Sequence, residues 1–327
     1  MILCLSGGLD SVIAYYYMGK PKTIFFDYGD YTKVEKERVL AIAPDTIIDK
    51  SLNLAGKSQG KTAYIPNRNL MFAALACRYA NTIVMAGIKD DDVPDKNRIA
   101  FTEMGELLSN ISGGTTIKVE SPFWEMTKSD LVAWAIDNLS TDELETVLEV
   151  SISCYTPTPD GKECRSCPSC FRKWNALDAN GIHTKFKNKA LMEEYLQKAK
   201  DGVYIPERNS SIIRSVTGYF SKDLRQKPKV YCFDIDGVLT VETEGYGEEV
   251  YRNRTPNIVM IEKVRKLHLM ENKIILHTAR HKEDISVTCD WLAKHSVPFD
   301  ALQFEKPKAD YYIDDRMIRM EEVLTHV

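Results

Sequence analysis

The sequence contains no apolar run of 18 or more residues, which a membrane-spanning helix would need. Its first residues, MILCLSGGLDS, lack the basic start and the long apolar stretch of a signal peptide, so we expect a cytoplasmic protein with no membrane partner. Glycine and proline are few (17 and 13 of 327 residues), unlike the composition of fibrous or disordered chains. The net charge of −4 supplies no overall positive field, so we expect no direct binding to nucleic acid.

The residues that are present are typical of a two-domain globular protein. With 44% hydrophobic and 28% charged residues, a chain of 327 residues is long enough for two hydrophobic cores. Short apolar stretches alternate with helical patterns in both halves, which predicts a parallel sheet covered by helices in each half.

In the first half the predicted strands are MILCL, TIFFDYG, TIIDK, NTIVMAG and TIKVESPF, and the predicted helices span 10–18, 32–43, 67–80, 101–110 and 128–138. In the second half the predicted strands are KVYCF, NKIILHTA and ADYYIDD, and the predicted helices span 256–271 and 283–295. We therefore expect an α/β protein with two doubly wound parallel-sheet domains, over 1–180 and 229–327, and a helical linker over 181–228.

The segment SGGLDS (residues 6–11) follows the first predicted strand and opens a helix. Two glycines at such a turn let backbone N–H groups converge on an anion at the helix N-terminus, a geometry that suits pyrophosphate. The G-x-x-x-x-G-K-[ST] loop of the other large nucleotide-binding class is excluded because its lysine is missing. The structural alternative is a tight turn with a serine or aspartate cap. The six residues resemble the SGGxDS loop of the ATP-pyrophosphatase family, which activates substrates by adenylation.

Four of the eight cysteines lie within a 17-residue window, at Cys154, Cys164, Cys167 and Cys170. The short spacings let three thiolates converge from one turn while Cys154 completes a tetrahedron, and four sulfurs without an open position indicate a structural zinc site. Disulfides are the alternative, but they are rare in a reducing compartment and geometrically awkward for cysteines three residues apart. An iron–sulfur cluster stays open, because sulfur ligands alone do not select the metal.

These features occur together with IPNRN (65–69), VPDKN (93–97), SPFWEMTKSDL (121–131) and SCYTP followed by ECRSCPSCFRKWNAL. In this combination, residues 1–177 resemble the 7-cyano-7-deazaguanine synthase family, a group of carbon–nitrogen ligases with an adenine nucleotide alpha hydrolase-like fold. The resemblance implies that ATP adenylates the carboxylate of 7-carboxy-7-deazaguanine and releases pyrophosphate. Ammonia then displaces AMP to give an amide, and a second activation dehydrates the amide to a nitrile.

The resemblance also implies roles for individual residues. The residues expected to bind ATP are Ser6, Gly7, Gly8, Leu9, Asp10 and Ser11 at the phosphates, with Phe26, Asp27 and Tyr28 as the wall for adenine and ribose. Asp10 is also expected near Mg²⁺. Arg68 and Lys128 are the cations expected on phosphate or acyl-adenylate oxygens. The residues expected to bind the deazaguanine are Asn69, Gly87 and Asp95. We expect the enzyme to be a homodimer.

One segment departs from the family pattern. The family usually presents an Asn-Ala-Val-Asp-Tyr-Ser-Gly type of loop that ends in Pro-Asp-Cys, whereas residues 87–97 read GIKDDDVPDKN. Activation of a carboxylate by ATP is indifferent to the amine that attacks afterwards. The alternative to an ammonia-dependent synthase is therefore an enzyme that joins the activated deazaguanine carboxylate to an amine of a protein.

In the second half, FDIDGVLT places Asp234 and Asp236 just past a predicted strand. Two carboxylates at this spacing can supply a nucleophile, a proton donor and ligands for a shared Mg²⁺, although a turn without chemistry has the same pattern. With ILHTAR, KPKAD and YYIDDR, they resemble the four motifs of haloacid dehalogenase superfamily phosphatases. The resemblance implies that Asp234 attacks phosphorus and that Asp236 protonates the leaving group. Thr278 and Lys306, less so Lys308, are expected to hold the phosphoryl oxygens, and Asp314 and Asp315 to complete the Mg²⁺ site.

Overall fold

The computed structural model describes residues 1–29, 32–55, 64–221, 228–241, 244–309, 311–312 and 315–325. The chain divides into two compact units, Met1–Leu224 and Arg225–Val327. No helix in the described ranges is both long enough and apolar enough to cross a membrane. The predicted α/β class with parallel sheets is confirmed.

The first unit is built on a five-stranded parallel sheet in the order β3-β2-β1-β4-β5. Its strands are β1 (Ile2–Cys4), β2 (Thr23–Phe26), β3 (Ile47–Asp49), β4 (Thr82–Val84) and β5 (Lys118–Glu120). All four residues of β2 are buried, as expected for a strand with helices on both faces. The strand order reverses between β1 and β4, and ligands of open α/β sheets bind at the carboxyl ends of the strands at such a point.

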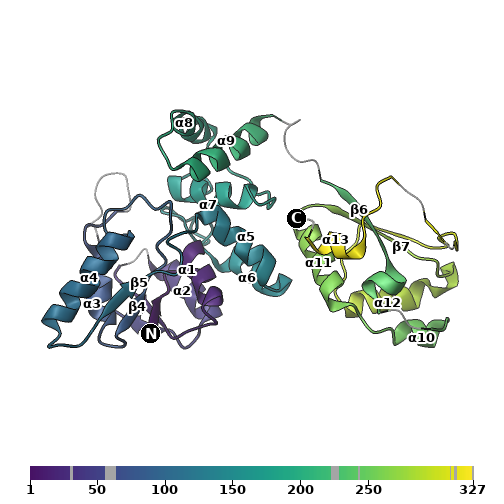
Figure 1. The fold of residues 1–327 in the computed structure, drawn as a ribbon, viewed down its shortest axis with the longest axis horizontal. Coiled ribbons are helices and arrows are strands. Elements are labelled where there is room, and N and C mark those ends of the chain that lie inside the picture. Colours follow the sequence, from purple (N-terminus) through teal and green to yellow (C-terminus); the bar gives the residue numbers. More distant parts are fainter. Residues whose placement is uncertain are drawn as a thin grey trace. The chain divides into compact units, whose positions relative to one another are not determined.

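Nine helices are described in this unit: α1 (Leu9–Tyr17), α2 (Lys33–Ile42), α3 (Arg68–Ala76), α4 (Arg98–Ile111), α5 (Lys128–Asn138), α6 (Thr141–Val150), α7 (Pro168–Asp178), α8 (Lys189–Lys200) and α9 (Pro206–Phe220). α3 and α4 lie on one side of the sheet, and α1, α5 and α6 contact one another on the other side (Figure 1). The helix α6 was not predicted, because the predicted helix 128–138 ends before it. It begins at a capping box in which Ser140 and Glu143 bond each other's backbone N–H groups.

The helices α8 and α9 belong to the first unit, which differs from the linker expected over 181–228. They lie beside each other next to α7 (Figure 1). Their buried residues Met192, Ala199, Ile212 and Val216 share a hydrophobic cluster with Phe171 and Trp174 of α7. This apolar face packs against α7, so the two helices extend the first unit.

The second unit contains a three-stranded parallel sheet in the order β6-β7-β8. Its strands are β6 (Val230–Asp234), β7 (Lys273–His277) and β8 (Ala301–Gln303), and its helices are α10 (Glu248–Arg252), α11 (Ile258–Leu269), α12 (Ile285–Lys294) and α13 (Met320–Thr325). Its core includes buried residues of β6, β7, α11 and α12, among them Phe233, Leu276, Val264 and Trp291.

The prediction of a strand at ADYYIDD was wrong for those residues of the segment that the structure describes. The third strand is β8, which pairs with β7 from Ala301 to Gln303. Tyr311 and Tyr312 are 86% and 45% exposed, so no buried face holds them in a sheet. A short run of aromatic and apolar residues resembles a strand in sequence, but a strand also needs a partner and a core to cover.

Candidate active site

The phosphate loop, residues 6–11, connects β1 to the start of α1. Gly7 has φ +76°, and a Cβ atom there would lie 3.2 Å from the backbone oxygen of Glu35, so glycine is required on both counts. The Ser11 hydroxyl donates to the carbonyl oxygen of Gly8 at 2.9 Å and accepts from the backbone N–H of Ser6 at 3.2 Å. Gly8 caps α1 without a side-chain bond to the first turn, so the N–H groups there are available to an anion.

The loop opens into a cavity of about 300 Å³ at the carboxyl ends of β1 and β2. Predicted site residues that line it are Ser6, Gly8, Leu9, Asp10, Ser11, Phe26, Tyr28, Arg68, Asn69, Lys128 and Cys154. The sequence therefore identified residues from five separate segments that the fold brings to one cavity.

Four residues predicted to bind the nucleotide or the substrate are outside this lining: Gly7, Asp27, Gly87 and Asp95. Asp27 is bound by Lys36 at 2.7 Å and by the Thr32 hydroxyl at 2.7 Å. Asp95 accepts from the backbone N–H of Asn69 at 3.1 Å and from its side-chain amide at 3.1 Å. Asp95 thus fixes Asn69 at the start of α3, and Asn69 itself reaches the cavity.

Gly87 sits under an aromatic ring. A Cβ atom there would lie 2.5 Å from Trp124, and the Ser121 hydroxyl donates to the Gly87 carbonyl oxygen at 2.6 Å. Any side chain at this position would displace the Trp124 ring.

Lys128 and Asp10 form an ion pair in the cavity wall. Burial lowers the pKa of Lys128, and the Asp10 carboxylate partly offsets this. Arg68 comes from the first turn of α3, and its Nη1 donates to the Tyr28 hydroxyl at 3.3 Å. Two cations thus lie close to the phosphate loop, one paired with a carboxylate and one with a phenol.

The sequence analysis missed several charged residues that line the same cavity, notably Asp91, Lys96 and Arg172. The Asp91 side chain is 3% exposed and pairs with Lys96 at 2.7 Å and with Arg172 at 3.2 Å. Burial would raise the pKa of Asp91, but the two cations outweigh it and hold that pKa at about 2. The acidic run in the segment 87–97 was the available signal, since it departed from the family pattern.

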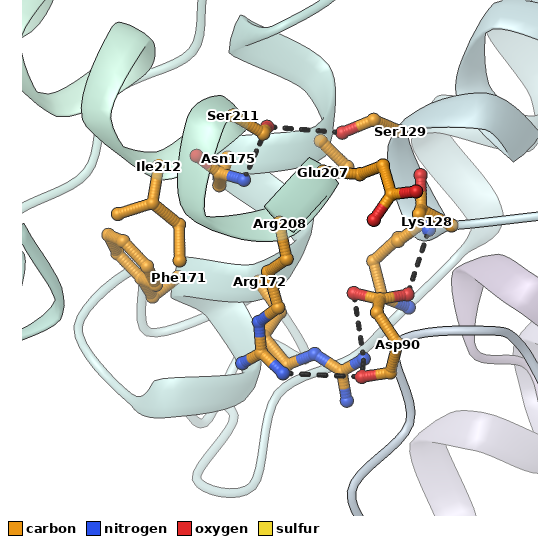
Figure 2. A pocket seen from close by; sticks show the side chains of 12 residues that line it. Asp90, Lys128, Ser129, Phe171, Arg172, Asn175, Glu207, Arg208, Ser211 and Ile212 are labelled. Carbon is orange, nitrogen blue, oxygen red and sulfur yellow. Dashed lines mark hydrogen bonds and ion pairs between the residues drawn. The ribbon is translucent and has the colours of Figure 1, made fainter. Parts of the chain in front are cut away.

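A second, narrower pocket lies between α5, α7 and α9 and shares Lys128 and Arg172 with the first (Figure 2). The carbonyl oxygen of Asp90 accepts from Arg172 at 3.3 Å and from Arg208 at 3.2 Å. The Asp90 carboxylate accepts from the backbone N–H of Lys128 at 3.1 Å. Arg208 belongs to α9 and lies 4.0 Å from the Tyr204 ring centroid. A helix expected in the linker therefore contributes to the wall of the site.

The four predicted cysteines come together, and their sulfur atoms all lie within 4.8 Å of one another. Cys164 Sγ and Cys170 Sγ are 3.9 Å apart, close to the roughly 3.8 Å between ligands of a tetrahedral zinc with bonds of about 2.3 Å. Backbone N–H groups of Cys164 and Cys170 donate to Cys154 Sγ and Cys167 Sγ at 3.2 and 3.5 Å. The donor set and its spacing fit zinc, and Cys154 also lines the large cavity.

In the second unit, four predicted residues gather at the carboxyl ends of β6, β7 and β8. Lys306 Nζ lies 2.5 Å from Asp234 Oδ2. Thr278 is fully buried, and its carbonyl oxygen accepts from the backbone N–H of Lys306 at 2.9 Å. The sequence analysis assigned no role to Arg280, whose Nε and Nη2 donate to the two carboxylate oxygens of Asp236 at 2.8 Å each.

The remaining predicted residues of the second unit do not join this group. Lys308 Nζ donates to the Tyr246 hydroxyl at 3.4 Å. Asp315 is exposed, and Asp314 lies outside the described residues. Within the described ranges, the cysteine cluster is the one group of three or more acidic, histidine or cysteine side chains spaced to hold a metal ion.

Part of the first unit matches a known protein family. Residues 38–181 match the family described as queuosine biosynthesis protein QueC. A 7-cyano-7-deazaguanine synthase from Leptospira interrogans is 25% identical over 222 residues, which cover 56% of this chain and 88% of that protein. This part of the chain is homologous to 7-cyano-7-deazaguanine synthases.

Two further relatives of the same name agree in coverage. The one from Paramagnetospirillum magneticum is 29% identical over 55% of this chain and 95% of its own length. The one from Pseudomonas fluorescens is 27% identical over 55% of this chain and 94% of its own length. A solved structure from Vibrio cholerae has 30% sequence identity over 30% of this chain and 88% of that chain, with a TM-score of 0.26. The family match ends at residue 181, inside the first unit.

Proposed function

We propose that the first unit is an ATP-dependent carbon–nitrogen ligase that activates the carboxylate of 7-carboxy-7-deazaguanine. The observation that supports this most is the cavity of about 300 Å³, which joins the phosphate loop to Arg68 and Lys128. The homology to 7-cyano-7-deazaguanine synthases supplies the substrate class.

In the proposed first step, a carboxylate oxygen of the substrate attacks the α-phosphorus of ATP and pyrophosphate leaves. The N–H groups at the start of α1, with the hydroxyls of Ser6 and Ser11, bind the phosphates. Lys128 and Arg68 stabilise the negative charge that develops on the leaving pyrophosphate. Phe26 at the end of β2 and Tyr28 just after it line the cavity beside the nucleotide, whereas Asp27 between them is outside the lining. Mg²⁺ bound with ATP near Asp10 would neutralise further phosphate charge.

In the proposed second step, ammonia attacks the acyl carbon of the adenylate, loses a proton and displaces AMP to give the amide. A second ATP adenylates the amide oxygen, and loss of AMP with two protons leaves the nitrile. Asn69, positioned by Asp95, is proposed to contact the deazaguanine together with the backbone at Gly87. Cys154, Cys164, Cys167 and Cys170 would hold a structural zinc that fixes the cavity wall beside Cys154.

The test is mass spectrometry of the products formed by the full chain from ATP, Mg²⁺ and 7-carboxy-7-deazaguanine. One tube contains ammonium and the other contains a protein extract. Amide or nitrile together with AMP in the ammonium tube would support the proposal. AMP with a deazaguanine mass increment on a polypeptide would replace ammonia by a protein amine as the acceptor, and no AMP in either tube would refute adenylation of this substrate.

For the second unit we propose a phosphohydrolase activity, because Asp234, Asp236, Thr278 and Lys306 meet at one sheet edge. Asp234 would attack phosphorus and break its bond to the leaving oxygen, which Asp236 would protonate, while Lys306 and Thr278 hold the phosphoryl oxygens. Water would then hydrolyse the aspartyl-phosphate to release phosphate. Release of phosphate from p-nitrophenyl phosphate by the full chain, with and without Mg²⁺, tests this activity. Phosphate release that persists unchanged in the Asp234→Asn variant would contradict the assignment of Asp234 as nucleophile.

A further inference from the structure

Glu35 is an acidic residue of the large cavity that neither the sequence analysis nor the proposed reaction uses. It lies in the first turn of α2, and its backbone oxygen lies 3.2 Å from the place that a Cβ atom at Gly7 would occupy. The other acidic residues in the lining, Asp10 and Asp91, are paired with cations. Within the described residues, the Glu35 carboxylate has no hydrogen-bond or ion-pair partner. Burial raises the pKa of Glu35 to about 7, and the more distant Arg68 charge only partly opposes this.

Arg68 offers an unused donor in the same cavity. Its Nε is buried without a hydrogen-bond partner, although its Nη1 bonds the Tyr28 hydroxyl. The guanidinium carbon lies 5.9 Å from the ring centroids of both Tyr28 and Phe72, so these rings restrict its position. The buried Arg68 Nε is left unsatisfied, so a bound polar group that accepts from it would remove the cost of its desolvation.

The chemistry of the two groups limits what can bind them together. A phosphate would accept from Arg68 but would repel the Glu35 carboxylate. A hydroxyl satisfies both, because it donates to a carboxylate and accepts from an N–H. Glu35 also lies directly beside the phosphate loop, and the sugar is the part of a nucleotide attached to its phosphates. A carboxylate at the end of the second strand region of an α/β sheet binds ribose in other nucleotide sites, but here Asp27 at that place is already bound by Lys36 and Thr32.

We propose that Glu35 binds the ribose hydroxyls of the nucleotide, with Arg68 Nε donating to the same hydroxyl group, and so selects ribonucleotides over deoxyribonucleotides. This inference rests on the proposed binding of ATP to the phosphate loop. It does not depend on which carboxylate or amine reacts afterwards.

The test measures nucleotide binding to the full chain by isothermal titration calorimetry with α,β-methylene-ATP and its 2′-deoxy and 3′-deoxy forms. A hydrogen bond to a charged group contributes about 1.5–3 kcal/mol, so the wild type should bind at least one deoxy form about 10- to 100-fold more weakly. In Glu35→Met the ratio of ribonucleotide affinity to deoxyribonucleotide affinity should fall to near 1, because ribonucleotide affinity drops while deoxyribonucleotide affinity changes little. Glu35→Gln, which keeps a neutral acceptor, should give an intermediate ratio.

Glu37→Gln is the matched control, since Glu37 is exposed on the same helix and should keep the wild-type ratio. A ratio that survives in Glu35→Met, or a wild type that does not discriminate, overturns the inference. Loss of affinity in Glu35→Met for ribose and deoxyribose forms alike would assign Glu35 to the base. Discrimination without adenylation of 7-carboxy-7-deazaguanine would uphold the inference and refute the proposed function. Absence of any nucleotide binding would overturn both.

Discussion

Lys128 and Asp10, 118 residues apart in the sequence, form an ion pair whose side chains are only 11% and 14% exposed. The pair joins the first turn of α5 to the first turn of α1, so it connects the phosphate loop to the TKSDL segment. A phosphate that enters the cavity would compete with Asp10 for the Lys128 ammonium. The pair therefore keeps the lysine in place until an anionic ligand arrives.

Replacement of Lys128 by methionine should abolish pyrophosphate release and destabilise the first unit. The variant leaves the Asp10 carboxylate without its cation, and removal of one partner of a buried pair costs about 3–5 kcal/mol. Coupled pyrophosphate detection and urea denaturation measure the two effects. The double variant Lys128→Met with Asp10→Asn should recover most of the stability but none of the activity. A double variant no more stable than the single one would contradict the pairing.

A substitution in the site of one unit should remove the activity of that unit and leave the activity of the other unchanged. Asp10→Ala should remove AMP formation and leave phosphate release from p-nitrophenyl phosphate unchanged, because Asp10 lies in the first unit. Asp234→Asn should do the reverse. Both activities are assayed on the same preparation of each variant. If either change removed both activities, the sites would not be independent.

Replacement of Cys167 by serine should lower the thermal stability of the first unit and release bound zinc. A closed four-sulfur site contributes folding free energy, so losing one ligand weakens the fold as well as the metal site. Metal content by mass spectrometry and a thermal melt measure the outcome. Cys77→Ser is the control, because Cys77 lies outside the cluster and should retain one zinc per chain. A Cys167→Ser protein with full zinc content and an unchanged melt would exclude this role.

The Glu35→Gln variant should be more stable than the wild type above pH 7. The pKa of Glu35 is about 7 in the folded chain against an ordinary value of 4.5, so the folded state binds more protons between these limits. The free energy of unfolding of the wild type therefore falls as pH rises from about 4.5 to about 7, by up to about 3 kcal/mol. Above pH 7 it falls no further on account of Glu35. Urea denaturation should show a much larger gain for Glu35→Gln at pH 8 than at pH 5, where the folded Glu35 is still protonated. An equal gain at both pH values would assign it to something other than the charge.

The features that depend on a local pattern of residues could be predicted from the sequence. The five strands of the first unit, the phosphate loop and the four cysteines follow from apolar runs, glycine placement and short spacings, and each lies where those patterns place it. The third strand of the second unit was misplaced, because the exposed Tyr311 and Tyr312 imitate a strand while the short β8 has little pattern of its own.

Some charged residues of the cavity were not found from the sequence. Glu35, Asp91 and Arg172 lie in segments rich in charge, and nothing in their spacing separates a buried charge from a solvated one. Their importance depends on burial and on partners far away in the chain. Arg172 lies 81 residues from Asp91, for example.

The backbone N–H of Ile152 donates to the carbonyl oxygen of Gly7 at 2.8 Å, so the phosphate loop is bound to the segment that leads into the cysteine cluster. The walls of one cavity therefore come from Ser6 at one end and Arg172 at the other. A ribosome adds roughly 5–20 residues per second, so the loop is made roughly ten seconds or more before its opposite wall. During that interval the nascent chain has the loop but no enclosed cavity. Under the proposed function, ATP consumption would begin only when the cysteine segment has been translated and folded.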